Sequence, residues 1–253
     1  MTANLDYVFQ SDVGQVRSHN EDSGGTYATE AGLLAFVADG MGGHRAGDVA
    51  SAMTSRLLKE AWMELETPLA ATEAESWLRQ QFKDINQAVH EHANNHEECQ
   101  GMGTTLVAAI CTDEYVAIGH IGDSRAYLRT DEGFSLKTAD HSLVEELRRT
   151  GQISEEEAEN HPRKNVLLRA LGTEPSVKMD VTTLPLDGAC DLLLCSDGLS
   201  DKISLPEIND ILLSKDTAES VSQSLIQLAN ERGGEDNISI ALVRLYSSMD
   251  RTG

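Results

Sequence analysis

The chain has 253 residues, of which 42 are Asp or Glu and 20 are Lys or Arg, so its formal net charge is −22 at pH 7. This charge argues against a nucleic-acid partner held through a basic face, and no apolar stretch approaches the ~18 residues of a membrane span. The N-terminus, MTANLDYVFQ, lacks a basic segment followed by an apolar one, so we expect a cytoplasmic monomer with neither a secretory signal nor a membrane partner.

The N-terminal part of the chain predicts one strand followed by two helices. Residues 33–39, LLAFVAD, form an apolar run that ends on an acid, as buried strands often do. Apolar residues at helical spacing then predict an amphipathic helix over about 46–65. A second helix is predicted over about 72–96, where Thr72 can cap the first turn and Glu75 follows three residues later.

The rest of the chain predicts strand hairpins and further helices. The runs 103–111 and 115–123 are separated by Thr-Asp-Glu, which favours a hairpin, and a third run covers 124–130. The segment 142–151 begins with serine and ends with glycine, a pattern typical of a helix. The remaining predicted elements are strands at 177–186, 191–197 and 238–245 and helices at 204–213 and 217–234.

The order of these elements indicates the fold class. Strands that cluster as hairpins and helices that come in consecutive pairs predict an α+β fold, with helices layered on antiparallel sheets. The sequence has no linker-like change in composition and no internal repeat, so we expect one domain over residues 1–253. Cys111, Cys190 and Cys195 lie in apolar runs and are expected to be buried thiols.

Acidic residues stand beside several of the predicted strands. They are Asp39, Asp123, Asp197 and Asp236, with Glu21 and Asp22 near the N-terminus. Burying several carboxylates together is prohibitively costly unless cations neutralise them. Oxygen ligands without cysteine or spaced histidines suit Mg²⁺ or Mn²⁺, and two such ions can activate a water molecule as a nucleophile. A single Asp-Gly is more often a turn, so this hypothesis requires neighbouring strands to bring the acids together.

Arg17 offers a second element of such a site. It stands five residues before Asp22 in a polar segment. A guanidinium group binds phosphate through two parallel hydrogen bonds, so an arginine beside a two-metal centre would indicate hydrolysis of a phosphate ester. The alternative, a surface arginine that pairs with neighbouring acids, is equally compatible with the sequence.

Eight ordered motifs carry a resemblance to a known family. They are RSHNED, VADGMGGHRAGDVAS, GMGTTL, HIGDSRAYL, DHSLVEEL, LLRALG, LLCSDGLSD and GGEDNISIALV. From about residue 7 to about residue 246, the sequence resembles the type 2C metal-dependent serine/threonine protein phosphatases, specifically their compact bacterial branch. The resemblance implies a four-layer α-β-β-α sandwich of two antiparallel sheets flanked by helix pairs, with a two-metal site at one end between the sheets.

The same resemblance implies which residues hold two Mn²⁺ or Mg²⁺ ions. Asp39 resembles the carboxylate that bridges both ions, and Gly40 resembles the residue that lends a backbone carbonyl to one of them. Asp197 and Asp236 resemble the other direct ligands.

Further roles follow from the resemblance for residues around these ligands. Asp22 and Glu21 resemble residues that reach the metals through water. Asp123 resembles a ligand of a third, weaker metal site in bacterial members, shared with Asp197, and Arg17 resembles the phosphate-binding arginine.

The general acid for the leaving group stays open at this point. Many eukaryotic members carry histidine two residues after the first aspartate, where this chain has Met41. His44 stands five residues after Asp39, and the ordinary pKa of histidine suits a proton donor near neutral pH. It can equally be a residue at the start of a helix that hydrogen-bonds the water around the metals.

The segment 150–172, TGQISEEEAENHPRKNVLLRALG, resembles the flap beside the active site, within a flap subdomain of about 140–172. Its polar composition and Pro162 favour a mobile loop. We therefore expect this segment to control the access of protein substrates more than that of small aryl phosphates.

The combined reading predicts a serine/threonine protein phosphatase in which activated water attacks phosphorus without a covalent phosphoenzyme. Its counterparts would be a bacterial Ser/Thr kinase and the phosphorylated targets of that kinase. One alternative is a regulatory phosphatase dedicated to an anti-sigma-antagonist protein, for which this chain has no room for the usual sensor domain. The other is a non-catalytic pseudophosphatase, which the presence of Asp39, Asp197 and Asp236 disfavours.

Overall fold

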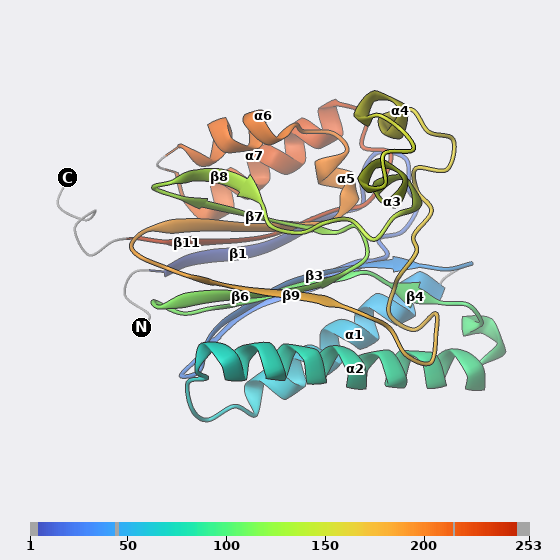
Figure 1. Cartoon of the computed structure of the whole chain (residues 1–253), viewed down its shortest axis with the longest axis horizontal. Helices are drawn as coiled ribbons and strands as arrows, with labels where there is room; N and C mark the ends of the chain where they lie inside the picture. Colours follow the sequence, from blue (N-terminus) through green and yellow to red (C-terminus); the bar gives the residue numbers. More distant parts are fainter. Residues whose placement is uncertain (1–4, 44–45, 215, 247–253) are drawn as a thin grey trace.

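The computed structural model describes residues 5–43, 46–214 and 216–246. Two antiparallel β-sheets lie face to face at its centre (Figure 1). The first sheet has the order β1 (Leu5–Asp12), β11 (Ile238–Leu245), β10 (Cys190–Cys195), β7 (Arg125–Thr130), β8 (Gly133–Leu136). The second has the order β2 (Asp22–Thr29), β3 (Gly32–Met41), β5 (Leu106–Cys111), β6 (Tyr115–Ile121), β9 (Asp180–Pro185), and the two-residue β4 (Gly103–Thr104) pairs with β3.

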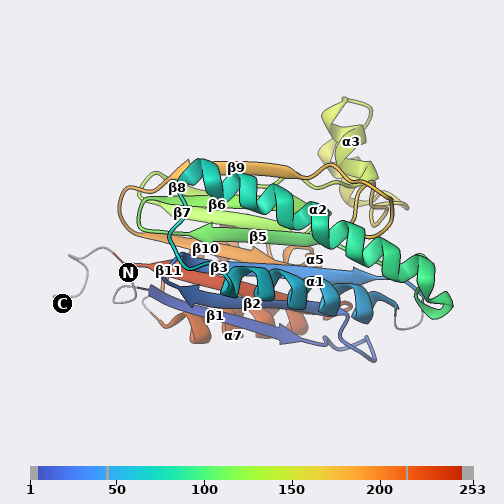
Figure 2. The same cartoon turned by 90° about the horizontal axis from the view of Figure 1, so that it is seen from below.

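Helices cover the outer face of each sheet (Figure 1, Figure 2). α1 (Ala46–Met63) and α2 (Ala71–Asn95) lie on the sheet of β2 to β9, and α6 (Leu205–Leu212) and α7 (Ala218–Glu231) lie on the sheet of β1 to β8. Shorter helices are η2 (Glu97–Cys99), α3 (Leu143–Arg149), α4 (Glu155–Glu159) and α5 (Asp197–Ser200). The predicted four-layer α-β-β-α sandwich with two antiparallel sheets is therefore confirmed.

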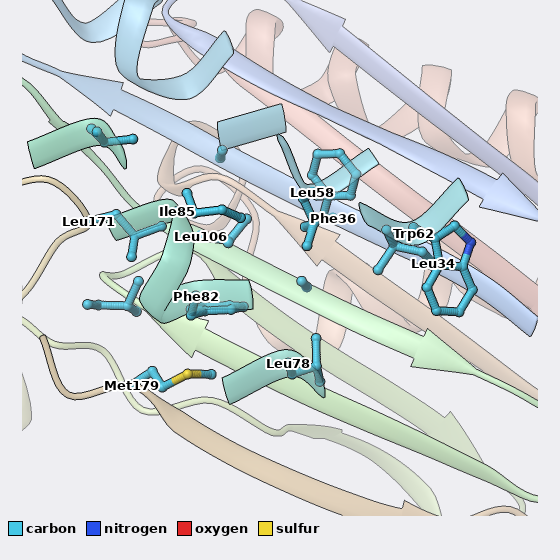
Figure 3. Close-up of a cluster of buried hydrophobic side chains, with 14 of the residues drawn as sticks. Leu34, Phe36, Leu58, Trp62, Leu78, Phe82, Ile85, Leu106, Leu171 and Met179 are labelled. Carbon is cyan, nitrogen blue, oxygen red and sulfur yellow. The ribbon is translucent and has the colours of Figure 1, made fainter. Parts of the chain in front are cut away.

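Apolar side chains fill the space between each pair of layers. Phe36, Trp62 and Phe82 belong to the cluster between the α1–α2 pair and its sheet (Figure 3). Leu33 and Leu192 belong to a second cluster between the two sheets, and a third cluster separates the other sheet from α6 and α7. The central strands are thus buried on both faces, which explains why their sequences are continuously apolar rather than alternating.

The sequence analysis missed β1, β2 and β8. The sequence of β2, DSGGTYAT, lacks the alternation of apolar residues that marks a strand. Gly24 is required by packing, because a Cβ there would lie 2.4 Å from a ring carbon of Phe9 and 2.5 Å from the carbonyl oxygen of Phe36. Tertiary contact therefore overrides a composition that disfavours strands.

The start of α2 and the end of β10 differ from the predicted boundaries. The N-cap of α2 is Ala70 rather than Thr72, and the Ala70 N–H donates to Glu73 Oε2 at 2.8 Å, so Glu75 has no part in the cap. β10 ends at Cys195, two residues before the predicted end, because Asp197 is already the first residue of α5.

Two further expectations concern the thiols and the membrane. All four cysteines are buried and free, which confirms the prediction for the three that lie in apolar runs. Within the described ranges, none of the helices has both the length and the apolar composition needed to cross a lipid bilayer.

Candidate metal centre

Asp39 and Asp22 face each other on neighbouring strands. Asp39 lies near the end of β3 and pairs in register with Asp22, the first residue of β2. Thr105 fixes the backbone of Asp39, whose N–H donates to Thr105 Oγ1 at 3.0 Å and whose carbonyl oxygen accepts the Thr105 N–H at 2.8 Å. The second sheet therefore presents both carboxyl groups at the same end of a strand pair.

Gly40 allows β3 and the first turn of α1 to approach each other closely. A Cβ on Gly40 would lie 2.2 Å from the carbonyl oxygen of Gly47 and 2.6 Å from that of Glu21. The Gly40 N–H donates to the same Glu21 oxygen at 3.0 Å. Because β3 continues through Gly40 to Met41, the Asp-Gly pair is not a turn, and the glycine is required by packing.

Asp197 and Asp236 come from the other sheet. Asp197 follows β10 as the first residue of α5, and Asp236 stands just before β11. Ser196 links the two sheets, since its Oγ donates to Asp22 Oδ2 at 2.8 Å and accepts the Ser239 N–H at 2.9 Å. The fold therefore brings acids from both sheets to one end of the sandwich.

Asn237 holds the segment before β2 in place. Its Nδ2 donates to the carbonyl oxygens of Val13 and His19 at 2.9 and 3.0 Å, and its Oδ1 accepts the Glu21 N–H at 2.8 Å. The side chain is buried, so both amide hydrogens and the amide oxygen have protein partners. Asn237 therefore fixes Glu21 relative to its own neighbour, Asp236.

Burial and mutual repulsion raise the pKa of the clustered carboxyl groups. Burial, the largest cause, raises the pKa of Asp22 and of Asp123 to about 6. The pKa of Asp39 is raised well above its usual range by burial and then by the charges of Asp22 and Asp197. Burial and then the charge of Asp123 do the same to the pKa of Asp197, and burial also raises the pKa of Glu21.

The donor set fits divalent metal ions. Asp22 Oδ1 and Asp197 Oδ1 are buried and accept no hydrogen bond from any residue that the structure describes. A buried carboxylate oxygen without a partner is costly, and a cation is the partner that would let several such groups stay ionised together. Carboxylate and backbone carbonyl oxygens are the ligands preferred by Mg²⁺ and Mn²⁺.

Arg17 lies at the exposed side of the cluster. Its Nη2 donates to Asp236 Oδ2 at 2.7 Å, and 51% of its side chain is exposed. In this structure it therefore pairs with a neighbouring acid, while about half of its side chain stays exposed to solvent. The predicted general acid, His44, lies outside the described residues.

A groove of about 800 Å³ opens beside Asp123 and Asp197. One wall comes from the segment 140–172, and another comes from residues that follow α5. Lys164 Nζ donates to Asp201 Oδ2 at 3.1 Å and so connects the two walls. Other charged lining residues are Arg125, Asp140, Glu145, Arg148, Glu155, Lys202, Glu207 and Arg232.

A second titratable cluster joins His120, His141 and Asp180. Their ligand atoms all lie within 4.8 Å of one another. Both histidines are buried, and the Asp180 side chain is about half exposed. The sequence analysis missed this cluster because its members stand far apart in the chain and form no recognisable spacing.

Comparisons with known proteins agree with this fold and show the family of the chain. The family model described as protein phosphatase 2C matches residues 14–242. The serine/threonine phosphatase stp of Listeria monocytogenes is 49% identical over 236 residues, which is 93% of this chain and 94% of that protein. The crystal structure of the serine/threonine phosphatase Stp1 from Staphylococcus aureus has a TM-score of 0.89 and 38% identity, covering 96% of this chain and 95% of that one. A structure of the catalytic domain of the phosphatase PstP with two manganese ions has a TM-score of 0.82 and 34% identity, covering 96% and 99% of the two chains.

Proposed function

Because the chain belongs to the protein phosphatase 2C family and is a serine/threonine protein phosphatase of that type, we propose that two Mn²⁺ or Mg²⁺ ions at the centre described above drive the hydrolysis of phosphoserine and phosphothreonine. The two unpartnered buried oxygens, Asp22 Oδ1 and Asp197 Oδ1, are the observation that supports this proposal most directly. Both oxygens require a positively charged partner, and both lie among carboxyl groups whose pKa is raised.

Each acid of the centre has a proposed role. Asp39, on which the charges of acids from both sheets act, would hold both ions, and the carbonyl oxygen of Gly40 would hold one of them. Asp197 and Asp236 would supply the remaining direct ligands. The other proposed contacts to metal are Asp22 and Glu21 through water, and Asp123 at a third site shared with Asp197.

When bound, the ions supply a Lewis acid that activates water and offsets the charge of the phosphate. The protein positions the acids: Ser196 holds one oxygen of Asp22, and Thr105 fixes the backbone of Asp39. The raised pKa of Asp39 and of Asp197 means that the metal-free protein holds protons on these groups more tightly than an exposed aspartate does. Metal binding is therefore expected to release protons.

Arg17 is proposed to bind the phosphate oxygens. One of its donors bonds Asp236, and a guanidinium group has five in all. Its bond to Asp236 and its half-exposed side chain support a position at the exposed side of the centre. A phosphate held there would lie next to the acids rather than at a distant part of the surface.

The groove beside Asp123 and Asp197 is proposed to take the polypeptide on one side of the phosphorylated residue. Its size and its mixed charges suit a peptide segment better than a small apolar molecule. The physiological substrates would then be phosphorylated proteins, and the enzyme would reverse the action of a Ser/Thr kinase. We also propose that residues 1–253 form one catalytic domain, with the segment of about 140–172 as its flap.

Hydrolysis of an aryl phosphate tests the metal-dependent mechanism. We expect Mn²⁺-dependent turnover that a chelator abolishes, and a loss of at least about 10²-fold in kcat for Asp39→Asn and for Asp197→Asn. Glu66→Gln, on an exposed surface between α1 and α2, serves as the control for the loss of one negative charge. Activity that survives the chelator, or no activity with Mn²⁺, would contradict the mechanism, and the second result would favour a pseudophosphatase.

A further inference from the structure

His141 binds both polar backbone groups of Gly122. The backbone N–H of His141 donates to the Gly122 carbonyl oxygen at 2.9 Å, and the backbone N–H of Gly122 donates to ring nitrogen Nδ1 of His141 at 3.2 Å. Gly122 has a φ of +101°, and a Cβ there would lie 2.6 Å from a side-chain carbon of Thr105. The residue before Asp123 is thus confined between His141 and Thr105.

The backbone of His141 continues this link into the segment 140–172. Its carbonyl oxygen accepts the Leu168 N–H at 2.7 Å, and the Leu143 N–H donates to the Val166 carbonyl oxygen at 2.8 Å. These bonds form a short antiparallel pairing that closes the base of the segment. Lys164, which lines the groove, stands only two residues from this pairing.

The other side of the His141 ring faces charged and titratable groups. Its Nε2 lies 3.3 Å from Asp180 Oδ2 and 3.3 Å from Arg169 Nη1. His120 stacks on the ring, with centroids 4.7 Å apart and planes inclined by 22°. The His120 ring is fixed in turn, because its Nε2 donates to the Ala139 carbonyl oxygen at 2.9 Å.

The tautomer of His141 argues against a metal ion in this cluster. Because Nδ1 accepts the Gly122 N–H, the proton of the neutral ring must be on Nε2, the nitrogen that faces Asp180. A metal ligand needs a free lone pair at that nitrogen, and the guanidinium of Arg169 would repel a cation there. Burial lowers the pKa of His141, which favours the neutral ring.

We infer that His141 is a positioning residue that couples the turn carrying Asp123 to the base of the segment 140–172. Nδ1 holds the backbone of Gly122, Nε2–H holds the ring against Asp180, and the backbone carbonyl holds Leu168. A shift at either end of this linkage reaches the other end through one residue, by its backbone and by its ring. The part of the inference that concerns metal binding rests on the proposed role of Asp123.

Two amide replacements separate the functions of the two ring nitrogens. His141→Asn places an amide oxygen near the position of Nδ1, whereas His141→Gln places its amide near Nε2 and leaves the Gly122 N–H without an acceptor. In metal-free protein, we expect hydrogen exchange of the Gly122 amide to be about tenfold faster in the Gln variant and within about threefold of wild type in the Asn variant. We also measure the rate of aryl phosphate hydrolysis as a function of Mn²⁺ concentration. The Mn²⁺ concentration that gives half of the maximal rate should rise about three- to tenfold in the Gln variant only.

His120→Gln is the matched control, because His120 is similarly buried in the same stack but its ring nitrogen Nε2 bonds the Ala139 carbonyl oxygen rather than Gly122. It should leave both the Gly122 exchange and the Mn²⁺ dependence unchanged. If the Gly122 amide exchanges at the same rate in the two His141 variants, the inference is overturned. If it exchanges faster in the Gln variant but the Mn²⁺ dependence of that variant is unchanged, the coupling to Asp123 is overturned.

A measurement on wild type keeps the test valid if a variant does not fold. Nitrogen chemical shifts of the His141 ring should report a proton on Nε2, and a proton on Nδ1 would contradict the inference. Because the exchange and the shifts are measured without metal, they remain informative if hydrolysis proves independent of Mn²⁺, a result that would instead overturn the proposed function.

Discussion

At the scale of single residues, Ser196 shows how a hydroxyl group can orient a metal-binding acid. Its hydroxyl group donates to one oxygen of Asp22, and the other oxygen of that carboxyl group is buried with no hydrogen-bond partner in the part of the chain that the structure describes. The same hydroxyl accepts the Ser239 N–H, so β11 determines where the hydroxyl stands. The orientation of Asp22, on one sheet, is therefore set by two residues of the other.

Ser196→Ala should weaken metal binding more than it weakens chemistry. The variant removes the hydrogen bond to Asp22 Oδ2 and leaves the Ser239 N–H without the hydroxyl that accepts it. We therefore expect the affinity for Mn²⁺ to be about five- to tenfold lower, and kcat at saturating Mn²⁺ to stay within about threefold of wild type. Calorimetric titration with Mn²⁺ and initial rates measure the two quantities. Ser200→Ala is the control, because the Ser200 hydroxyl has no hydrogen-bond partner among the described residues. Equal loss of affinity in both variants would contradict the assigned role.

His44→Ala addresses the leaving-group proton. If His44 is the general acid, the variant should lose about 10²-fold or more in kcat on a phosphopeptide, whose serine alkoxide needs a proton, and much less on an aryl phosphate with a good leaving group. The basic limb of the pH–rate profile should also change for the phosphopeptide. If both substrates lose the same factor, His44 is not the acid.

The sequence was sufficient to predict some residues of the centre and not others. Asp39 and Asp197 could be found because each ends a recognisable apolar run. Thr105 and Ser196 could not, since they act on partners 66 and 174 residues away and carry no local pattern. Positioning residues of this kind are defined by the tertiary fold alone.

At the scale of elements, the segment 140–172 is fixed at its base by backbone pairing, whereas its middle is held by a side-chain ion pair. Bridges between Ser142 and Leu167 and between Thr104 and Leu171 hold the base. The middle contains α3 and α4, and it reaches the rest of the protein through the exposed pair of Lys164 and Asp201. Sequence analysis predicted α3 from its serine cap and glycine stop, but the bridges depend on residues brought together only by folding.

Lys164→Ala should change the handling of protein substrates. The variant removes the contact between the two walls of the groove, so we expect kcat/KM for a phosphopeptide to change by about threefold or more, with aryl phosphate hydrolysis within about twofold of wild type. Arg163→Ala, at the exposed neighbouring position that does not line the groove, is the control. Equal effects on both substrates would mean that this segment does not select substrates by size.

At the scale of the whole molecule, the acidic centre makes stability depend on pH and on metal. Asp22 and Asp123 have a pKa of about 6 in the folded protein, against about 3.9 in an unfolded chain. A pKa that is raised by folding means that the folded state binds the proton more tightly. Its stabilising contribution is therefore complete below about pH 4 and is lost as the pH rises through about 6.

Added Mn²⁺ should consequently raise the unfolding temperature more at about pH 7.5 than at about pH 5, where protons compete for the same oxygens. Scanning calorimetry with Mn²⁺ and with chelator at each pH isolates the centre from the many surface acids. In the double variant Asp22→Asn, Asp123→Asn, the increase in unfolding temperature caused by Mn²⁺ should differ less between the two pH values. If Mn²⁺ raises the unfolding temperature of wild type equally at both pH values, these carboxyl groups are not linked to the metal.

The pairing of β1 with β11 determines when the active site can be completed during synthesis of the chain. The first described strand pairs along its whole length with the last, from Leu5 opposite Leu245 to Asp12 opposite Ile238. Pairings between such distant parts of a chain form late and slowly. A growing chain on the ribosome can assemble the sheet of β2 to β9, yet Asp236 cannot join Asp39 until the ribosome has passed β11. Newly made copies therefore stay inert toward phosphorylated neighbours until β11 has been made and has paired with β1.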